Sequence, residues 1–132
     1  MKFFVTGVGG QLGHDVMNEL LKRGHEGVGS GTRAAYSGAD DGSAVTKAPY
    51  AALDITDRDA VEKVISEVRP DAVIHCAAWT VVDLAEEADN RAKVRAVNAG
   101  GTQNMADVCK KLGCKMTYIS TDYVFDGQGT AP

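Results

Sequence analysis

Glycines recur at a fixed spacing near the N-terminus, at Gly7, Gly10 and Gly13, directly after the apolar run 3–5. Between a strand and a helix, such glycines permit a tight turn, close approach of the backbone to a pyrophosphate and close packing of helix on strand. The helix that follows presents unpaired N–H groups and the positive end of its dipole to the phosphates. The spacing therefore predicts a dinucleotide-binding loop, with a purely structural turn as the alternative.

A second polar cluster, formed by Ser120, Thr121 and Asp122, follows an apolar stretch near the other end of the sequence. Hydroxyls and a carboxylate at the end of a parallel strand lie where open α/β sheets bind ligands. The cluster is typical of the beginning of a redox active site, and capping of the strand end is the alternative role for Thr121. No tyrosine in the sequence has a lysine four residues later.

Strand and helix patterns alternate along the chain, which indicates a parallel sheet with helices on both faces. Apolar runs predict strands at about 2–6, 26–28, 50–53, 71–76 and 115–120, and amphipathic spacing predicts helices at about 11–23, 56–69 and 89–112. Right-handed crossovers give a Rossmann-type, doubly wound parallel sheet with strand order 3-2-1-4-5. The glycine-rich segment 30–49 is expected to form a flexible loop.

Three residues are expected to mark helix ends. Gly24 should end the first helix in a left-handed conformation, and Gly113 should close the long one. Thr56 resembles an N-cap for the helix at 56–69, with an acidic residue in its first turn.

Composition limits the function classes. The 132 residues fit one domain. The net charge of −4 argues against a nucleic-acid partner, and no apolar run approaches the roughly 20 residues of a membrane span. Without a signal peptide at the N-terminus, a cytoplasmic location is expected.

Cysteine and histidine do not indicate a metal site. The three cysteines are expected to be small buried hydrophobes. His75 and Cys76 are adjacent on a strand and should therefore point to opposite faces.

The second strand is followed by Thr32 and Arg33 rather than by the acid that would bind a ribose 2′-hydroxyl. An arginine there suits a 2′-phosphate, so the residues favour NADPH over NADH without deciding between them. Asp40 and Asp41 come later and are expected to be solvated.

Five segments occur in an order that resembles the extended short-chain dehydrogenase/reductases, and most closely the dTDP-4-dehydrorhamnose reductases. They are the glycine loop and the segments 53–57, 70–80, 97–99 and 120–127. The last of these, Ser-Thr-Asp-Tyr-Val-Phe-Asp-Gly, is the most specific. The resemblance implies an NAD(P)H-dependent reductase acting on a nucleotide-linked 4-keto sugar, from dTDP-4-dehydrorhamnose to dTDP-rhamnose.

The resemblance also implies roles for individual residues. The cofactor would be bound by the following residues: Gly7, Gly10, Gln11, Leu12, Gly13, Asp54, Ile55, Ala77, Ala78, Trp79, Thr80, Asn98 and Ser120. Thr121 would be the catalytic hydroxyl and, with Asp122, would contact the substrate sugar. Four of these residues have structural alternatives: a turn for Asp54, an N-cap for Thr80, a bond to a buried backbone group for Asn98 and a core or interface anchor for Trp79.

The family's catalytic tyrosine and lysine belong to a Tyr-x-x-x-Lys helix downstream of the matched segments. We therefore expect 1–132 to be the N-terminal part of such a reductase, an incomplete NAD(P)-binding Rossmann domain that is inactive by itself. We also expect an exposed sheet edge that pairs with another copy. A non-catalytic NAD(P)-binding regulatory protein of the same fold, like the regulatory subunit of methionine adenosyltransferase, is the alternative.

Overall fold

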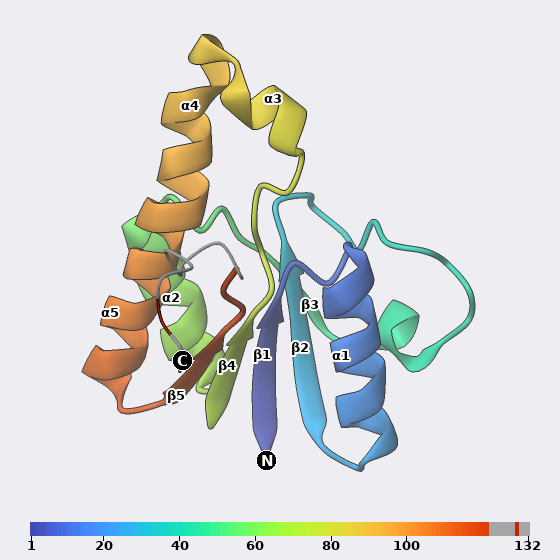
Figure 1. The fold of residues 1–132 in the computed structure, drawn as a ribbon. Coiled ribbons are helices and arrows are strands. Elements are labelled where there is room, and N and C mark those ends of the chain that lie inside the picture. Colours follow the sequence, from blue (N-terminus) through green and yellow to red (C-terminus); the bar gives the residue numbers. More distant parts are fainter. Residues whose placement is uncertain (122–128, 130–132) are drawn as a thin grey trace.

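The computed structural model describes residues 1–121 and 129 and contains a five-stranded parallel sheet in the order β3-β2-β1-β4-β5 (Figure 1). The strands are β1 (Lys2–Thr6), β2 (Glu26–Gly31), β3 (Tyr50–Ala52), β4 (Ala72–His75) and β5 (Lys115–Tyr118). The helices are α1 (Gln11–Lys22), η1 (Ala44–Lys47), α2 (Arg58–Val68), α3 (Val82–Glu86), α4 (Ala88–Arg95), η2 (Ala96–Gly101) and α5 (Thr102–Leu112). The predicted Rossmann-type fold and strand order are confirmed.

Alternate residues of β1 divide the interior into two layers, because successive strand side chains point to opposite faces. Phe4 packs with Ile65 of α2 and Met105 of α5 on one face of the sheet. Val5 packs with Met17 of α1 on the other face. Helices thus cover both faces, and all strand carboxyl ends meet at one edge.

The second strand is longer than its sequence suggests. It runs to Gly31 and pairs with β3 through Gly29 and Ser30, whereas glycine is normally depleted in strands. The glycines are needed for packing: a Cβ on Gly29 would lie 2.9 Å from Val8 Cγ2, and one on Gly27 would overlap the Met17 thioether. Glycine in β2 therefore lets α1 lie close to the sheet.

The segment after β2, predicted as a flexible loop, contains the one-turn helix η1 and is fastened to α1. Asn18 of α1 accepts a hydrogen bond from the Val45 amide at 2.9 Å and donates to the Ser43 hydroxyl at 3.1 Å. His14 of α1 contacts the Tyr36 hydroxyl at 2.6 Å and the Asp41 carboxylate at 3.1 Å. Asp41 is therefore bound to the protein rather than simply solvated.

The predicted N-cap of α2 was wrong by one residue. Asp57 is the cap and accepts a hydrogen bond from the Ala60 amide at 3.0 Å. The Thr56 hydroxyl instead donates to Asp54 at 2.7 Å, so Thr56 belongs to the preceding turn. The left-handed conformation expected of Gly24 is confirmed, with φ of 77°, and Gly113 closes α5 as expected, with φ of 70°.

The long helical stretch predicted at 89–112 is interrupted by η2, a π-helical segment between α4 and α5. Helix α3 was not predicted. Figure 1 shows α3 and α4 standing beyond the carboxyl edge of the sheet, with the chain from β4 rising to meet them. This arrangement places the π-helical segment beside the loop that follows β4.

Candidate cofactor site

The glycine turn joins β1 to α1 at the carboxyl edge of the sheet. Gly7 has a φ of 71°, and its amide donates to the Ser30 carbonyl at 2.8 Å. Gly10 is the N-cap of α1 and supplies no capping side chain, although the first amides of any helix lack intrahelical partners. These amides and the positive end of the helix dipole form a suitable position for a phosphate anion.

The three glycines of the motif have different steric environments. A Cβ on Gly7 would lie 2.8 Å from the Ala77 amide nitrogen, and one on Gly13 would lie 2.9 Å from Val8 Cα. Both contacts are with backbone atoms that cannot move aside. Among the described residues, a Cβ on Gly10 would meet just the Gly7 carbonyl oxygen, at 3.4 Å. The fold itself therefore requires glycine at 7 and 13, whereas position 10 is open and exposed. The exposed Gln11 and Leu12 follow it in the first turn of α1.

Asp54 and Ile55 follow β3 at the same edge of the sheet. Asp54 accepts hydrogen bonds from the amide and the hydroxyl of Thr56, at 2.9 and 2.7 Å. The Ile55 side chain is buried against Gly101, where a Cβ would lie 2.6 Å from Ile55 Cγ1. Asp54 thus stabilises the turn before α2, which was the structural alternative for this residue. Its exposed position also leaves it accessible to a ligand.

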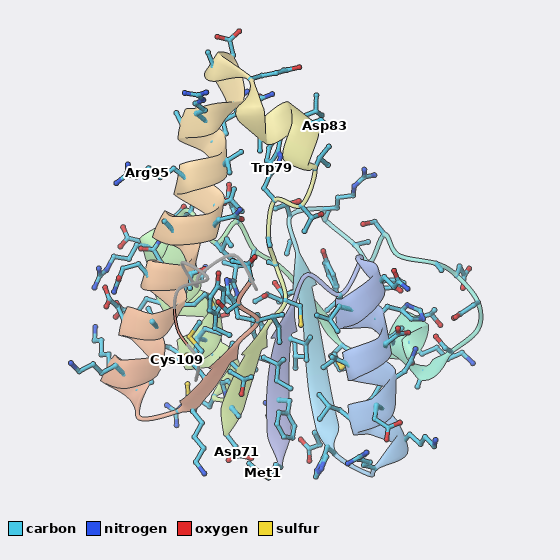
Figure 2. The ribbon with its side chains drawn as sticks, viewed as in Figure 1. Met1, Asp71, Trp79, Asp83, Arg95 and Cys109 are labelled. Atoms are coloured by element: carbon cyan, nitrogen blue, oxygen red, sulfur yellow. The ribbon has the colours of Figure 1, made fainter. Side chains whose placement is uncertain are left out.

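The loop after β4 lies directly against the glycine turn, as the contact between Gly7 and Ala77 demonstrates. The Ala77 amide donates to the Thr6 hydroxyl at 3.1 Å. Ala78 and Thr80 are exposed, and the Trp79 indole N–H donates to the Val81 carbonyl at 3.2 Å. Figure 2 shows Trp79 on this loop, just before α3. Val81 rather than Thr80 is the N-cap residue of α3.

Asn98 in η2 fixes this loop through both ends of its amide. Its oxygen accepts from the Trp79 amide at 2.7 Å, and its nitrogen donates to the Trp79 carbonyl at 3.2 Å. Asn98 therefore satisfies backbone groups of the loop, which was the structural alternative for this residue. It also sets the position of the loop relative to the helix.

A buried imidazole lies beneath the loop and was not identified as a site residue from the sequence. His75 is 1% exposed, contacts Thr6 and Thr102 through its two nitrogens, and stacks on Tyr118. Burial lowers the pKa of His75, which favours the neutral form. Its tight packing between polar residues could not be read from the apolar pattern of the strand.

The three cysteines were expected to be buried, and one of them, Cys109, is; Cys76 and Cys114 are half-buried. Cys109 is buried in the core, and burial together with its neighbour Cys114 raises its pKa to about 12 (Figure 2). Cys76 is half-buried, and burial raises its pKa as well. Within residues 1–121 and 129, no cluster of three or more His, Cys, Asp or Glu side chains could hold a metal ion, and no helix is long and apolar enough to cross a membrane.

The chain leaves β5 toward the predicted catalytic cluster. Tyr118, the last residue of β5, is paired in register with His75 of β4, so the next residues continue along the same edge of the sheet. Ser120 and Thr121 are exposed there. Asp122 lies outside the described residues. The structure therefore places the glycine turn, the loop after β4 and the start of the Ser120–Thr121 segment at one edge, with Asp54 farther along it.

Comparisons with known proteins give a consistent family. The family model described as the RmlD substrate binding domain matches residues 1–132. The dTDP-4-dehydrorhamnose reductase of Streptomyces griseus is 37% identical over 131 residues, covering 99% of this chain and 36% of that protein. The reductase of the same name from Mycobacterium tuberculosis is 38% identical over 126 residues, covering 96% of this chain and 34% of that protein. The chain thus spans little more than a third of these relatives.

Solved structures agree with the fold. The dTDP-4-dehydrorhamnose reductase of Bacillus anthracis in complex with NADP superposes with a TM-score of 0.72 at 34% identity, covering 96% of this chain and 38% of that one. A UDP-glucose 4-epimerase of Thermus thermophilus in complex with NAD gives a TM-score of 0.78 at 29% identity, covering 92% and 38%. These similar structures include complexes with either nicotinamide cofactor.

Proposed function

This chain belongs to the RmlD substrate binding domain family, in which its relatives are dTDP-4-dehydrorhamnose reductases, and we propose that it forms the cofactor-binding part of such a reductase. The reaction would be the NAD(P)H-dependent reduction of a nucleotide-linked 4-keto sugar, from dTDP-4-dehydrorhamnose to dTDP-rhamnose. The observation that carries the proposal is the open N-cap at Gly10, in contact range of the loop after β4 through Gly7 and Ala77. This is the crevice between β1 and β4, where the strand order reverses and doubly wound sheets bind dinucleotides.

Each part of the crevice suits one part of a dinucleotide. The Gly10 amide donates to the Gly7 carbonyl at 3.0 Å, so the amides at Gln11 and Leu12 would hold the pyrophosphate, which would contact Gly10 through its open, side-chain-free position. Asp54 and Ile55 would flank the adenosine. The nicotinamide half would be held by the loop after β4 and its neighbours, which are Ala77, Ala78, Trp79, Thr80, Asn98 and Ser120. The cofactor supplies the hydride, while the protein supplies binding and orientation.

Arg33 gives a reason to prefer NADPH over NADH. It follows β2 and is exposed, and the sequence places no acid there to hold a ribose 2′-hydroxyl. Arg33→Gln should therefore weaken binding of NADPH and leave binding of NADH unchanged. Equal loss for both cofactors by calorimetry would contradict this role.

Thr121 would orient the carbonyl oxygen of the sugar, with Asp122 contacting the sugar. An aliphatic hydroxyl is a poor acid near neutral pH, so proton delivery would need the tyrosine of a Tyr-x-x-x-Lys pair, a spacing that 1–132 does not contain. General acid catalysis commonly contributes about 10²–10⁴-fold. We therefore expect no reductase activity from 1–132 by itself.

A cytoplasmic location is part of the same proposal.

The test is consumption of NADPH by the full-length protein with dTDP-4-dehydrorhamnose, followed through the absorbance of the reduced nicotinamide. Turnover that depends on both substrates is expected, with NADPH binding measured separately by calorimetry. Binding without turnover would support the non-catalytic alternative. Absence of binding would refute the cofactor site.

A further inference from the structure

His75 lies at the centre of a chain of hydrogen bonds that joins three elements. Its Nδ1 is 2.8 Å from the Thr6 hydroxyl on β1, and its Nε2 is 3.2 Å from the Thr102 hydroxyl on α5. The Thr6 hydroxyl oxygen is also 3.1 Å from the Ala77 amide, and the Thr102 hydroxyl is 2.9 Å from the Asn98 carbonyl. His75 and Thr6 are each 1% exposed, so their polar atoms depend on one another rather than on water.

The two ends of the chain determine where each proton lies. The Thr102 hydroxyl has one hydrogen and donates it to the Asn98 carbonyl, so its oxygen must accept from His75 Nε2–H. In a neutral imidazole Nδ1 is then an acceptor and receives the hydrogen of the Thr6 hydroxyl. The Thr6 oxygen in turn accepts from the Ala77 amide. The direction runs from Ala77 N–H through Thr6, His75 and Thr102 to the Asn98 carbonyl.

We propose that His75, held as the neutral Nε2–H tautomer, is a positioning residue that sets the loop after β4 for the nicotinamide half of the cofactor. The proposal rests on the proposed function and adds a residue to it. The chain begins at Ala77, the second residue of the loop, and ends at the carbonyl of Asn98, whose side chain binds the amide and the carbonyl of Trp79. The Ala77 end of the segment 77–79 is thus bound by the directional chain itself, and the Trp79 end by the side chain of the residue at which that chain ends.

A charged His75 is incompatible with this direction. A second ring proton on Nδ1 would face the Thr6 hydroxyl, whose own hydrogen would then lose its acceptor in a buried site. Among the described titratable residues, Tyr118 on β5 is in ring contact with His75, at 5.9 Å between centroids, and brings a phenol rather than a carboxylate to the ring. Burial also lowers the pKa of His75, which agrees with a neutral ring.

The first experiment measures the tautomer of His75 in the full-length protein by ¹⁵N NMR of its ring nitrogens at neutral pH. The expected result is one protonated nitrogen, Nε2, and one unprotonated nitrogen, Nδ1. An Nδ1–H tautomer or a doubly protonated ring would overturn the proposal. This measurement requires no cofactor, so it tests the tautomer of His75 independently of the proposed function.

The second experiment tests the effect on the cofactor with Thr102→Val, which removes the end of the chain and retains the shape of the side chain. Its matched control is Thr46→Val, because the Thr46 hydroxyl also donates to a backbone carbonyl, that of Ser43 at 2.7 Å, but lies in η1. Binding is measured by calorimetry for NADPH and for 2′-phospho-ADP-ribose, which lacks the nicotinamide. Thr102→Val should weaken NADPH about tenfold, since a buried imidazole N–H loses its acceptor.

2′-phospho-ADP-ribose should bind equally to the unsubstituted protein and to both variants. If Thr102→Val weakens the binding of NADPH and of 2′-phospho-ADP-ribose equally, the effect is a general structural one, and the positioning role is overturned. Unchanged NADPH binding would overturn it too. If the unsubstituted protein binds neither molecule, the cofactor site itself is refuted, and the positioning role with it.

Discussion

The most discriminating perturbation is a change of charge at Gly10, because the structure tolerates a side chain there and the proposed pyrophosphate would not. We compare Gly10→Asp with Gly10→Asn, which has nearly the same shape and no charge. A Cβ at position 10 meets the Gly7 carbonyl oxygen at an acceptable 3.4 Å. Asp and Asn are both favoured N-cap residues and differ from Gly by a few tenths of a kcal/mol, so both variants should fold with nearly unchanged stability.

The expected loss of affinity follows from the shared position of the two anions. A capping carboxylate would accept the same α1 amides that would hold a phosphate, which places the charges about 4 Å apart. Repulsion at that distance is about 4 kcal/mol at an effective dielectric constant near 20, and about half that after screening at this exposed turn. The affinity of Gly10→Asp for NADPH should thus fall about 30- to 700-fold below that of Gly10→Asn.

Calorimetry of NADPH binding to both variants measures the difference, and thermal unfolding confirms that both are folded. If Gly10→Asp binds NADPH as tightly as Gly10→Asn, no phosphate lies at the N-terminus of α1, and the glycine motif is a structural turn. The comparison separates charge from bulk because both side chains occupy the same volume.

Three further predictions follow. Asp57→Ala should lower the free energy of unfolding in urea by about 1 kcal/mol, because it removes the N-cap bond to the Ala60 amide; an unchanged midpoint would contradict the cap. Thr121→Val in the full-length protein should lower kcat about tenfold, because it removes about one hydrogen bond to the substrate carbonyl, and should change NADPH affinity little. An unchanged kcat would exclude that contact. Because burial lowers the pKa of His75, the free energy of unfolding should be highest above pH about 6.5 and should fall as the pH drops below that value. His75→Gln should therefore show a flatter dependence of Tm on pH in that range.

The sequence predicted the elements whose apolar pattern is set by burial. β1 and α1 were located to within a residue because their periodicity reflects packing in the two layers of the core. β2 was underestimated because Gly29 and Gly31 have no strand preference of their own, and their pairing with β3 is a tertiary contact. The loop after β2 was called flexible from its glycine and serine content, although His14 and Asn18 on α1 bind it through side chains that composition cannot locate.

The wrongly predicted N-cap of α2 shows that two neighbouring residues can both be suitable caps for one helix. Thr56 and Asp57 are adjacent residues of types that cap helices, and the choice depends on the turn before them. Asp54 accepts both polar hydrogens of Thr56, which commits that residue to the turn and leaves Asp57 as the cap. The sequence contains all three residues, but their competition is resolved only by backbone geometry.

The site residues predicted from the sequence differ from His75, which was not predicted, in what makes them recognisable. Glycine spacing is visible in one dimension because the turn is local. The His75 chain requires two register relations at once: Thr6 is paired with His75 across β1 and β4, and Thr102 follows Asn98 by four residues through a π-helical segment. Since both relations arise from the fold, a strand histidine in an apolar run gives no sign of them. The loop that would receive the nicotinamide is consequently held by residues buried beneath it, and substitutions at those positions should alter cofactor geometry without touching the cofactor.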